Sequence, residues 1–122
     1  MDVRKLQKIV VAALEDIKGK DIEVINTTRL TSLFDRIVIA SGDSNRQVKA
    51  LARNVQEKVR EAGGEVVSVE GEENGEWVLV DLGDIVVHVM QPAIRQYYNL
   101  EELWQVTPGQ HRKLAESKVA RS

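Results

Sequence analysis

The chain has 122 residues, 43% of them hydrophobic and 30% charged, which suits one globular domain with its own core. It carries 17 basic and 19 acidic residues, and a net charge of −2 argues against a protein whose main task is to coat nucleic acid. The absence of cysteine excludes disulfides, thiolate catalysis and cysteine-bound zinc.

The N-terminal segment predicts a helix, because apolar residues recur at helical spacing from Leu6 to Ile17. Asp2 can cap its start and Gly19 can end it. The apolar run is too short for a signal peptide or a membrane span, so we expect a cytoplasmic protein that does not contact membranes.

Strands are predicted at residues 21–26 and 34–40, with a polar turn between them. In the following sequence SGDSNRQ, Ser44 and Gln47 form a capping box that predicts the start of a second helix. A turn of this kind can hold phosphate on free N–H groups. With one glycine and an aspartate in the turn, we favour the simpler interpretation of a helix cap.

Three further strands are predicted at residues 65–70, 76–82 and 85–90, the last two joined by a tight hairpin at Gly83-Asp84. Residues 92–104 predict one broken helix or two short ones. Together these elements predict a single-domain α/β fold with a mixed sheet of about five strands and helices on both faces. We expect the domain to cover residues 1–104. Residues 105–122, with four basic residues and one acidic residue, predict a flexible basic extension.

The acidic residues and His88 give little support for a catalytic site. A nucleotidyl-transfer site needs acids two apart on a strand after a Gly-Ser turn. Asp21 and Glu23 precede the turn, and Asp81 and Asp84 flank a hairpin, where they need not converge. His88 has no serine or second histidine at a recognisable spacing, so a packed, hydrogen-bonded side chain is favoured over a base. We expect no enzyme, no metal and no cofactor.

The aromatic residues are few, while valine, isoleucine and leucine fill every predicted buried stripe. Tryptophan and tyrosine are enriched in interface hot spots, which suggests a binding role. The alternative is that the rings pin the C-terminal helices to the sheet. The rings are Phe34, Trp77, Tyr97, Tyr98 and Trp104.

The runs IVIASGDSNRQVKALARNV, GEWVLVDLGDIVVHVM and RQYYNLEELW resemble the ribosomal silencing factor family (RsfS, also called Iojap or YbeB). The likeness extends over residues 3–104. It implies a fold related to nucleotidyltransferases without their catalytic acids. It also implies binding to the large ribosomal subunit through its fourteenth protein, with obstruction of small-subunit joining and lower translation when nutrients are short.

On this resemblance we expect an apolar docking surface with an acidic rim suited to a basic ribosomal protein. A role in large-subunit assembly, or less favourably a metal-dependent nucleotidyltransferase, stays open. A homodimer also stays open, although Arg36 and Ile37 follow Asp35 where many members of the family carry two aromatics after an aspartate. Contact of the basic extension with ribosomal RNA stays open as well, with a solvated end as the favoured alternative. The expected partner-binding residues are Glu76, Trp77, Asp81, Asp84, Tyr98, Asn99, Leu100, Glu101 and Trp104.

Overall fold

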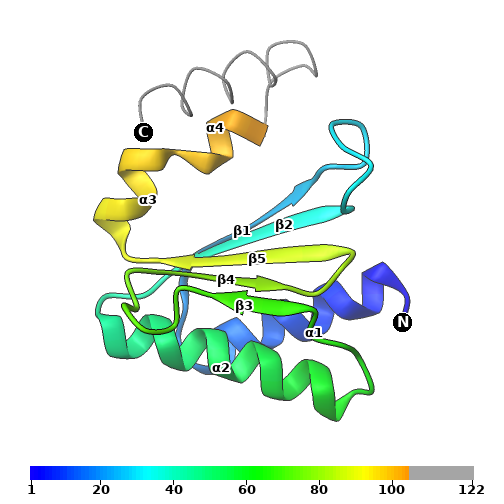
Figure 1. The fold of residues 1–122 in the computed structure, drawn as a ribbon, viewed down its shortest axis with the longest axis horizontal. Coiled ribbons are helices and arrows are strands. Elements are labelled where there is room, and N and C mark those ends of the chain that lie inside the picture. The colour runs from blue at the N-terminus through cyan, green and yellow to red at the C-terminus, as the bar shows by residue number, and fades with distance from the viewer. Residues whose placement is uncertain (105–122) are drawn as a thin grey trace.

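A computed structural model describes residues 1–104, which form one sheet with helices on both sides (Figure 1). The strands are ordered β1-β2-β5-β4-β3; β2 and β5 run parallel, and the other neighbouring pairs are antiparallel. This confirms the predicted α/β class and the mixed sheet. The elements are α1 (Val3–Asp16), β1 (Lys20–Asn26), β2 (Arg36–Ser41), α2 (Asn45–Glu61), β3 (Ser68–Glu70), β4 (Trp77–Asp81), β5 (Ile85–Met90), α3 (Pro92–Tyr98) and α4 (Leu100–Trp104).

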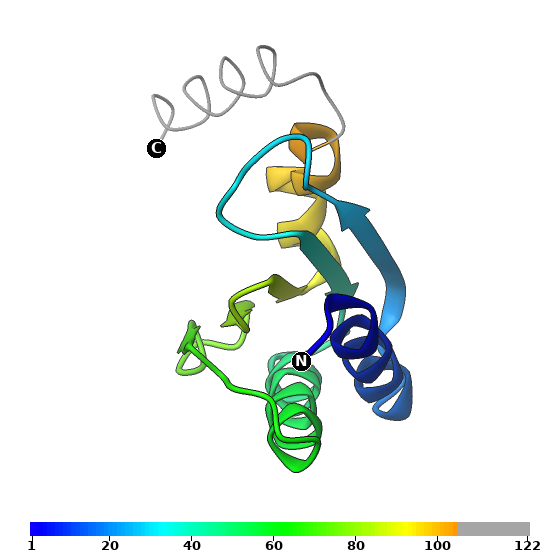
Figure 2. The same ribbon diagram turned by 90° about the vertical axis from the view of Figure 1, so that its right-hand side faces the viewer.

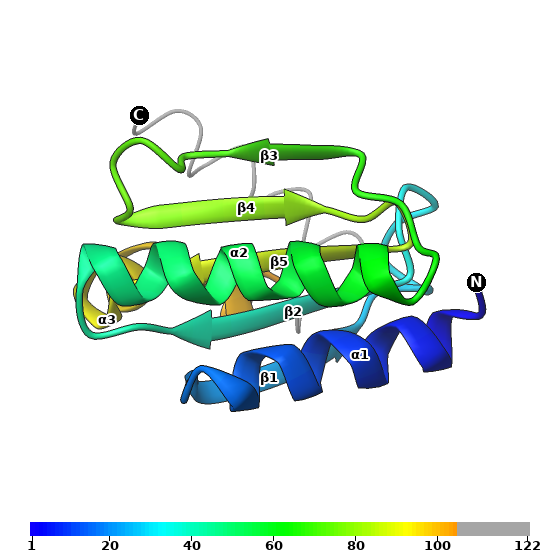
Figure 3. The same cartoon turned by 90° about the horizontal axis from the view of Figure 1, so that it is seen from below.

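The two faces of the sheet are covered unequally. The long helices α1 and α2 lie side by side beneath one face (Figures 2 and 3), and their apolar stripes bury an aliphatic core rich in valine. The short helices α3 and α4 cover a smaller cluster of Ile25, Ile37, Ile39 and Met90, which belong to β1, β2 and β5. Of β4 only Trp77 packs against this cluster, and no residue of β3 does, so that half of the second face carries a thinner cover.

The predicted N-terminal caps are confirmed. The Asp2 side chain accepts a hydrogen bond from the Arg4 backbone, and the Ser44 hydroxyl accepts one from the Gln47 backbone at 3.1 Å. The predicted end of α1 at Gly19 is not confirmed, because Ile17 is the C-cap and Lys18, with φ of 60°, takes the left-handed conformation that follows it. The C-terminal segment forms two short helices, because Asn99 takes a left-handed conformation with φ of 48° and interrupts them.

Three predicted strands are shorter than expected. The strand predicted at 76–82 is β4, which covers only Trp77–Asp81. The strand predicted at 34–40 is β2, and Phe34 lies outside it because the Thr27 hydroxyl binds the Phe34 carbonyl and holds the preceding loop in place. The strand predicted at 65–70 is the three-residue β3, whose ladder starts where Ser68 faces Asp81. The preceding residues follow the glycines that end α2 and contribute one backbone bond, from Val67 to Asp81.

Candidate docking site

The first part of the site is a pair of side chains on adjacent strands. Trp77 begins β4, and its indole Nε1–H donates to Nδ1 of His88 on β5 at 3.0 Å. His88 is buried, and burial lowers its pKa to about 4 because the charged imidazolium is disfavoured away from water. Nδ1 is therefore an acceptor and the imidazole is neutral at pH 7. The prediction of a packed, hydrogen-bonded histidine is confirmed.

Tyr98, at the end of α3, extends this pair to the surface. Its ring lies 4.9 Å from that of Trp77 and 5.0 Å from that of Tyr97, measured between centroids. Tyr97 is 79% exposed and Tyr98 39% exposed. Tyr97 therefore does not pin the C-terminal helices to the sheet, whereas Tyr98 both contacts Trp77 and faces solvent. Together Trp77, His88 and Tyr98 form what we call the ring cluster.

A charged clamp positions the C-terminal helices above the sheet. The Arg95 guanidinium on α3 donates to the Glu101 carboxylate at 2.5 Å and to the Ser41 hydroxyl at 2.9 Å, and its Nη2 lies 3.7 Å from the Glu23 carboxylate. The Arg95 and Glu101 side chains are only 13% and 17% exposed. The contacts of Glu101 are thus internal and hold α4 against α3. Asn99 occupies the turn between them, and its side-chain amide donates to Glu102.

Helix α4 turns its apolar face inward. Leu100 and Trp104 pack against the cluster of isoleucines and Met90 on the second face of the sheet. The Trp104 ring meets Phe34 edge-on, with centroids 5.3 Å apart and planes at 62°. The alternative that the rings pin the C-terminal helices in place therefore holds in part for Trp104, since this ring holds α4 against the loop before β2.

A groove of about 700 Å³ opens between α4 and the less covered half of the sheet. Leu100, Leu103 and Trp104 line it on the helix side, and Leu79, Val86 and His88 line it on the strand side. Since His88 also binds Trp77, the groove is continuous with the ring cluster. The structure thereby brings four of the predicted docking residues, Trp77, Tyr98, Leu100 and Trp104, to one side of the sheet.

The predicted acidic rim is divided. Glu76 is exposed just before β4, and Asp81 ends the same strand, so the two lie about 17 Å apart at the usual strand rise. Asp81 lines the groove and accepts a hydrogen bond from the Gly83 backbone. Asp84 is exposed in the hairpin, and its carbonyl accepts from the backbones of Asp35 and Arg36. A single ring of carboxylates around the apolar residues does not form.

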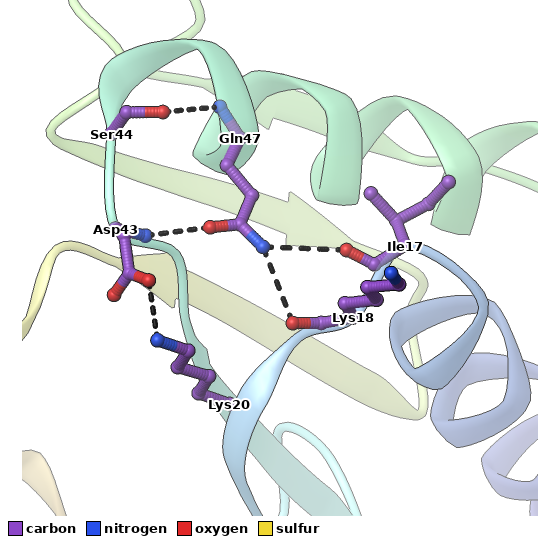
Figure 4. Close-up of polar contacts among 6 residues, drawn as sticks. All are labelled: Ile17, Lys18, Lys20, Asp43, Ser44 and Gln47. Carbon is purple, nitrogen blue, oxygen red and sulfur yellow. Dashed lines mark hydrogen bonds and ion pairs between the residues drawn. The ribbon is translucent and has the colours of Figure 1, made fainter.

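The turn before α2, which could have held a phosphate, is filled by its own side chains (Figure 4). The Gln47 amide accepts from the Asp43 backbone at 2.7 Å and donates to the carbonyls of Ile17 and Lys18 at the end of α1. Asp43 also pairs with Lys20, and this contact raises the pKa of the Lys20 ammonium. The favoured interpretation as a helix cap is confirmed, with an added role in joining α1 to α2.

Two further observations concern the described part of the chain. Within residues 1–104, no group of three or more acidic or histidine side chains is placed to hold a metal ion. No helix in that range is long and apolar enough to cross a bilayer. The predicted basic extension at 105–122 falls outside the described residues.

Several residues of the site were not predicted from the sequence. Phe34 was assigned to a strand, and Arg95 was not singled out at all. The bond between Trp77 and His88 depends on strand register, since Leu79 rather than Trp77 faces His88 across the ladder. Pairing of the two hairpin strands about Gly83-Asp84 could have indicated this proximity.

Comparison with known proteins agrees with this architecture. A family model described as "Ribosomal silencing factor during starvation" matches residues 1–122. Ribosomal silencing factor RsfS of Chromobacterium violaceum is 61% identical over 104 residues, which is 85% of each chain. A crystal structure of a protein from the same organism is 60% identical with a TM-score of 0.84, covering 85% of this chain and 87% of that one. The mouse protein "Mitochondrial assembly of ribosomal large subunit protein 1" is 31% identical over 99 residues, covering 79% of this chain and 43% of that protein.

Proposed function

Because this chain belongs to the ribosomal silencing factor family, we propose that it binds the large ribosomal subunit in the cytoplasm and blocks joining of the small subunit. The contact is made with the fourteenth protein of the large subunit. Occupying that position obstructs subunit association and lowers translation when nutrients are limiting. Such a mechanism needs affinity and position but no cofactor and no reacting group.

The observation that carries this proposal is the continuity of the ring cluster with the groove. The Trp77 and Tyr98 rings are in tilted contact, with centroids 4.9 Å apart and planes at 52°, and His88 links Trp77 to the groove beside α4. Partly exposed tryptophan and tyrosine next to an apolar groove are typical of the centre of a protein interface. Asp81 within the groove and Glu76 beside Trp77 would attract a basic ribosomal protein and repel RNA.

An order-of-addition experiment on density gradients tests this function. The protein is added to purified large subunits before or after small subunits, and joined ribosomes are measured. We expect it to travel with free large subunits and to reduce joining more strongly when added first. Failure to travel with large subunits in moderate salt would reject the proposal.

A second candidate is large-subunit assembly, which the name of the mouse relative favours. The same docking surface would serve both roles, so the gradient does not separate them. Profiling large-subunit precursors in cells that lack the protein does, since assembly predicts their accumulation during growth in rich medium. Silencing without assembly predicts normal precursors and a defect confined to starvation.

The enzymatic alternative, a metal-dependent nucleotidyltransferase, is tested by melting the protein with Mg²⁺ and a nucleotide. A ligand that binds only the folded state raises the melting temperature. We expect no shift, because Gln47 and Lys20 already engage the backbone and carboxylate of Asp43 at the turn. We keep a homodimer and a contact of residues 105–122 with ribosomal RNA as secondary proposals, tested by sedimentation and by salt-dependent RNA binding.

A further inference from the structure

We propose that, in the free protein, residues 105–122 fold back and occupy the groove beside α4. The first reason is that the groove leaves apolar surface uncovered. Leu33 and Val67 on its borders are 81% and 58% exposed, and Leu79 and Val86 in its interior are only half-buried. Contiguous apolar surface of this kind in a soluble protein marks a site that another segment covers.

The second reason is where the chain leaves the described domain. Trp104, the last described residue, itself lines the groove. Residue 105 therefore starts at the border of the groove. A segment tethered so closely has an effective concentration in the millimolar range, so even weak contacts suffice. Leu114 lies ten positions after Trp104, and the extended length of this stretch, about 33 Å, exceeds the roughly 17 Å of β4.

The third reason is charge. Of the 17 basic and 19 acidic residues, four and one respectively lie in 105–122, so this segment has a formal charge of +3 and residues 1–104 have −5. The groove contains the carboxylates of Glu70 and Asp81, and among the described residues that line it there is no lysine or arginine. Arg112 and Lys113 immediately precede Leu114, which would place cations beside an apolar side chain suited to this surface.

The consequence is competition with a partner. If the segment covers the groove in most molecules, the apparent dissociation constant of the partner rises by the inverse of the open fraction. This consequence rests on the proposed function, whereas the contact within the chain does not. A partner would have to displace the segment before it gained the apolar residues of the groove.

Paramagnetic relaxation enhancement tests the contact directly. The chain has no cysteine, so Ser117→Cys gives a single site for a nitroxide label in the complete protein. We expect selective broadening of the Leu79 and Val86 methyl signals, with Val10 and Val59 on the α1–α2 side unaffected. Leu114→Asp should abolish the broadening, while Ala115→Asp, which adds the same charge, should preserve at least half of it.

Three results would overturn the proposal. Groove methyls that resemble those of Val10 and Val59 would place the segment elsewhere. Broadening that arises only when labelled chains are mixed with separate isotope-labelled chains would assign the groove to a second copy. Equal effects of the two aspartate substitutions would show that Leu114 makes no specific contact. If the broadening is found but no variant binds large subunits, the proposed function fails while the contact within the chain stands.

Discussion

Trp77 and His88 are joined by a hydrogen bond of 3.0 Å from the indole Nε1–H to Nδ1. This bond fixes the orientation of a ring that is partly exposed and in contact with Tyr98. It also satisfies a buried imidazole, which would otherwise be costly to desolvate. One residue pair therefore couples the stability of the fold to the shape of the candidate docking surface.

The first prediction concerns pH. The pKa of His88 is lowered from 6.5 to about 4 by burial, so between these values the unfolded chain binds a proton that the folded chain does not. The free energy of unfolding should thus fall as pH drops through this window, by about 3 kcal/mol in total. The stabilisation is fully present above pH 6.5.

His88→Asn isolates this contribution, because the asparagine carbonyl can accept from Trp77 without titrating. Urea unfolding at several pH values between 7 and 4 gives the pH dependence of the free energy of unfolding for both proteins. The contribution of the carboxylates is common to both and cancels in the difference. If the free energy of unfolding of the variant changed with pH as steeply as that of the parent protein, the assignment of the proton to His88 would be contradicted.

The second prediction compares neighbouring tyrosines. Tyr98→Ala removes the ring that contacts Trp77 and should weaken binding to large subunits by about 2 kcal/mol, a factor of about 30. Tyr97→Ala removes the more exposed ring and should cost under about 0.5 kcal/mol of binding. Circular dichroism controls for folding. Equal losses for both variants would show that Tyr98 has no special place in the interface.

The third prediction concerns the clamp on the C-terminal helices. Arg95→Ala strands the half-buried Glu101 carboxylate and should reduce the free energy of unfolding by about 3 kcal/mol. Arg95→Lys should recover only part of this, because an ammonium lacks the planar fork that reaches both Ser41 and Glu101.

Lys58→Ala is the matched control, since its ion pair with Glu61 is exposed and spans 3.7 Å. That substitution should change the free energy of unfolding by less than about 0.5 kcal/mol. Thermal denaturation of the three variants is the measurement. Comparable effects of Arg95→Ala and Lys58→Ala would contradict the structural role of the clamp.

The fourth prediction uses two glycines with the same conformation but different surroundings. Gly71 and Gly83 have φ of 87° and 88°, so alanine is strained at both. A Cβ at Gly71 would lie 2.1 Å from the Trp77 carbonyl oxygen, whereas at Gly83 the nearest atom is 3.9 Å away, on Val67.

Gly83→Ala should therefore cost about 1 kcal/mol of stability from the backbone alone. Gly71→Ala should cost at least about 2 kcal/mol more, since the backbone around Trp77 must move. Urea unfolding measures both. If Gly71→Ala were no worse than Gly83→Ala, the close packing of the β3–β4 turn against Trp77 would be refuted.

The sequence predicted most of the fold because its signals are local. Ser44 and Gln47 marked the start of α2 through their spacing alone, and helical periodicity marked α1. The reach of Gln47 to the carbonyls of Ile17 and Lys18 was not predictable, because it depends on how two helices are placed. The same limit applies to strand ends, which the Thr27–Phe34 contact decides across a loop.

The site was predicted as a set of residues but not as an arrangement. The four-residue spacing of Leu100 and Trp104 puts them on one helical face, but the spacing alone does not indicate that this face turns inward. Glu101 was expected on an acidic rim, yet it pairs with Arg95, a residue that only the folded chain brings near. The aromatic composition favoured a binding surface. The groove beside it was not predictable, because it depends on how α4 lies over β4 and β5.

The most direct test of the central claim is calorimetric titration of the complete protein with the isolated fourteenth protein of the large subunit. We expect saturable one-to-one binding that Trp77→Ala weakens by about 2 kcal/mol or more and that Lys58→Ala leaves unchanged. No binding by the parent protein, or equal binding by a folded Trp77→Ala variant, would contradict the assignment of the ring cluster as the docking surface.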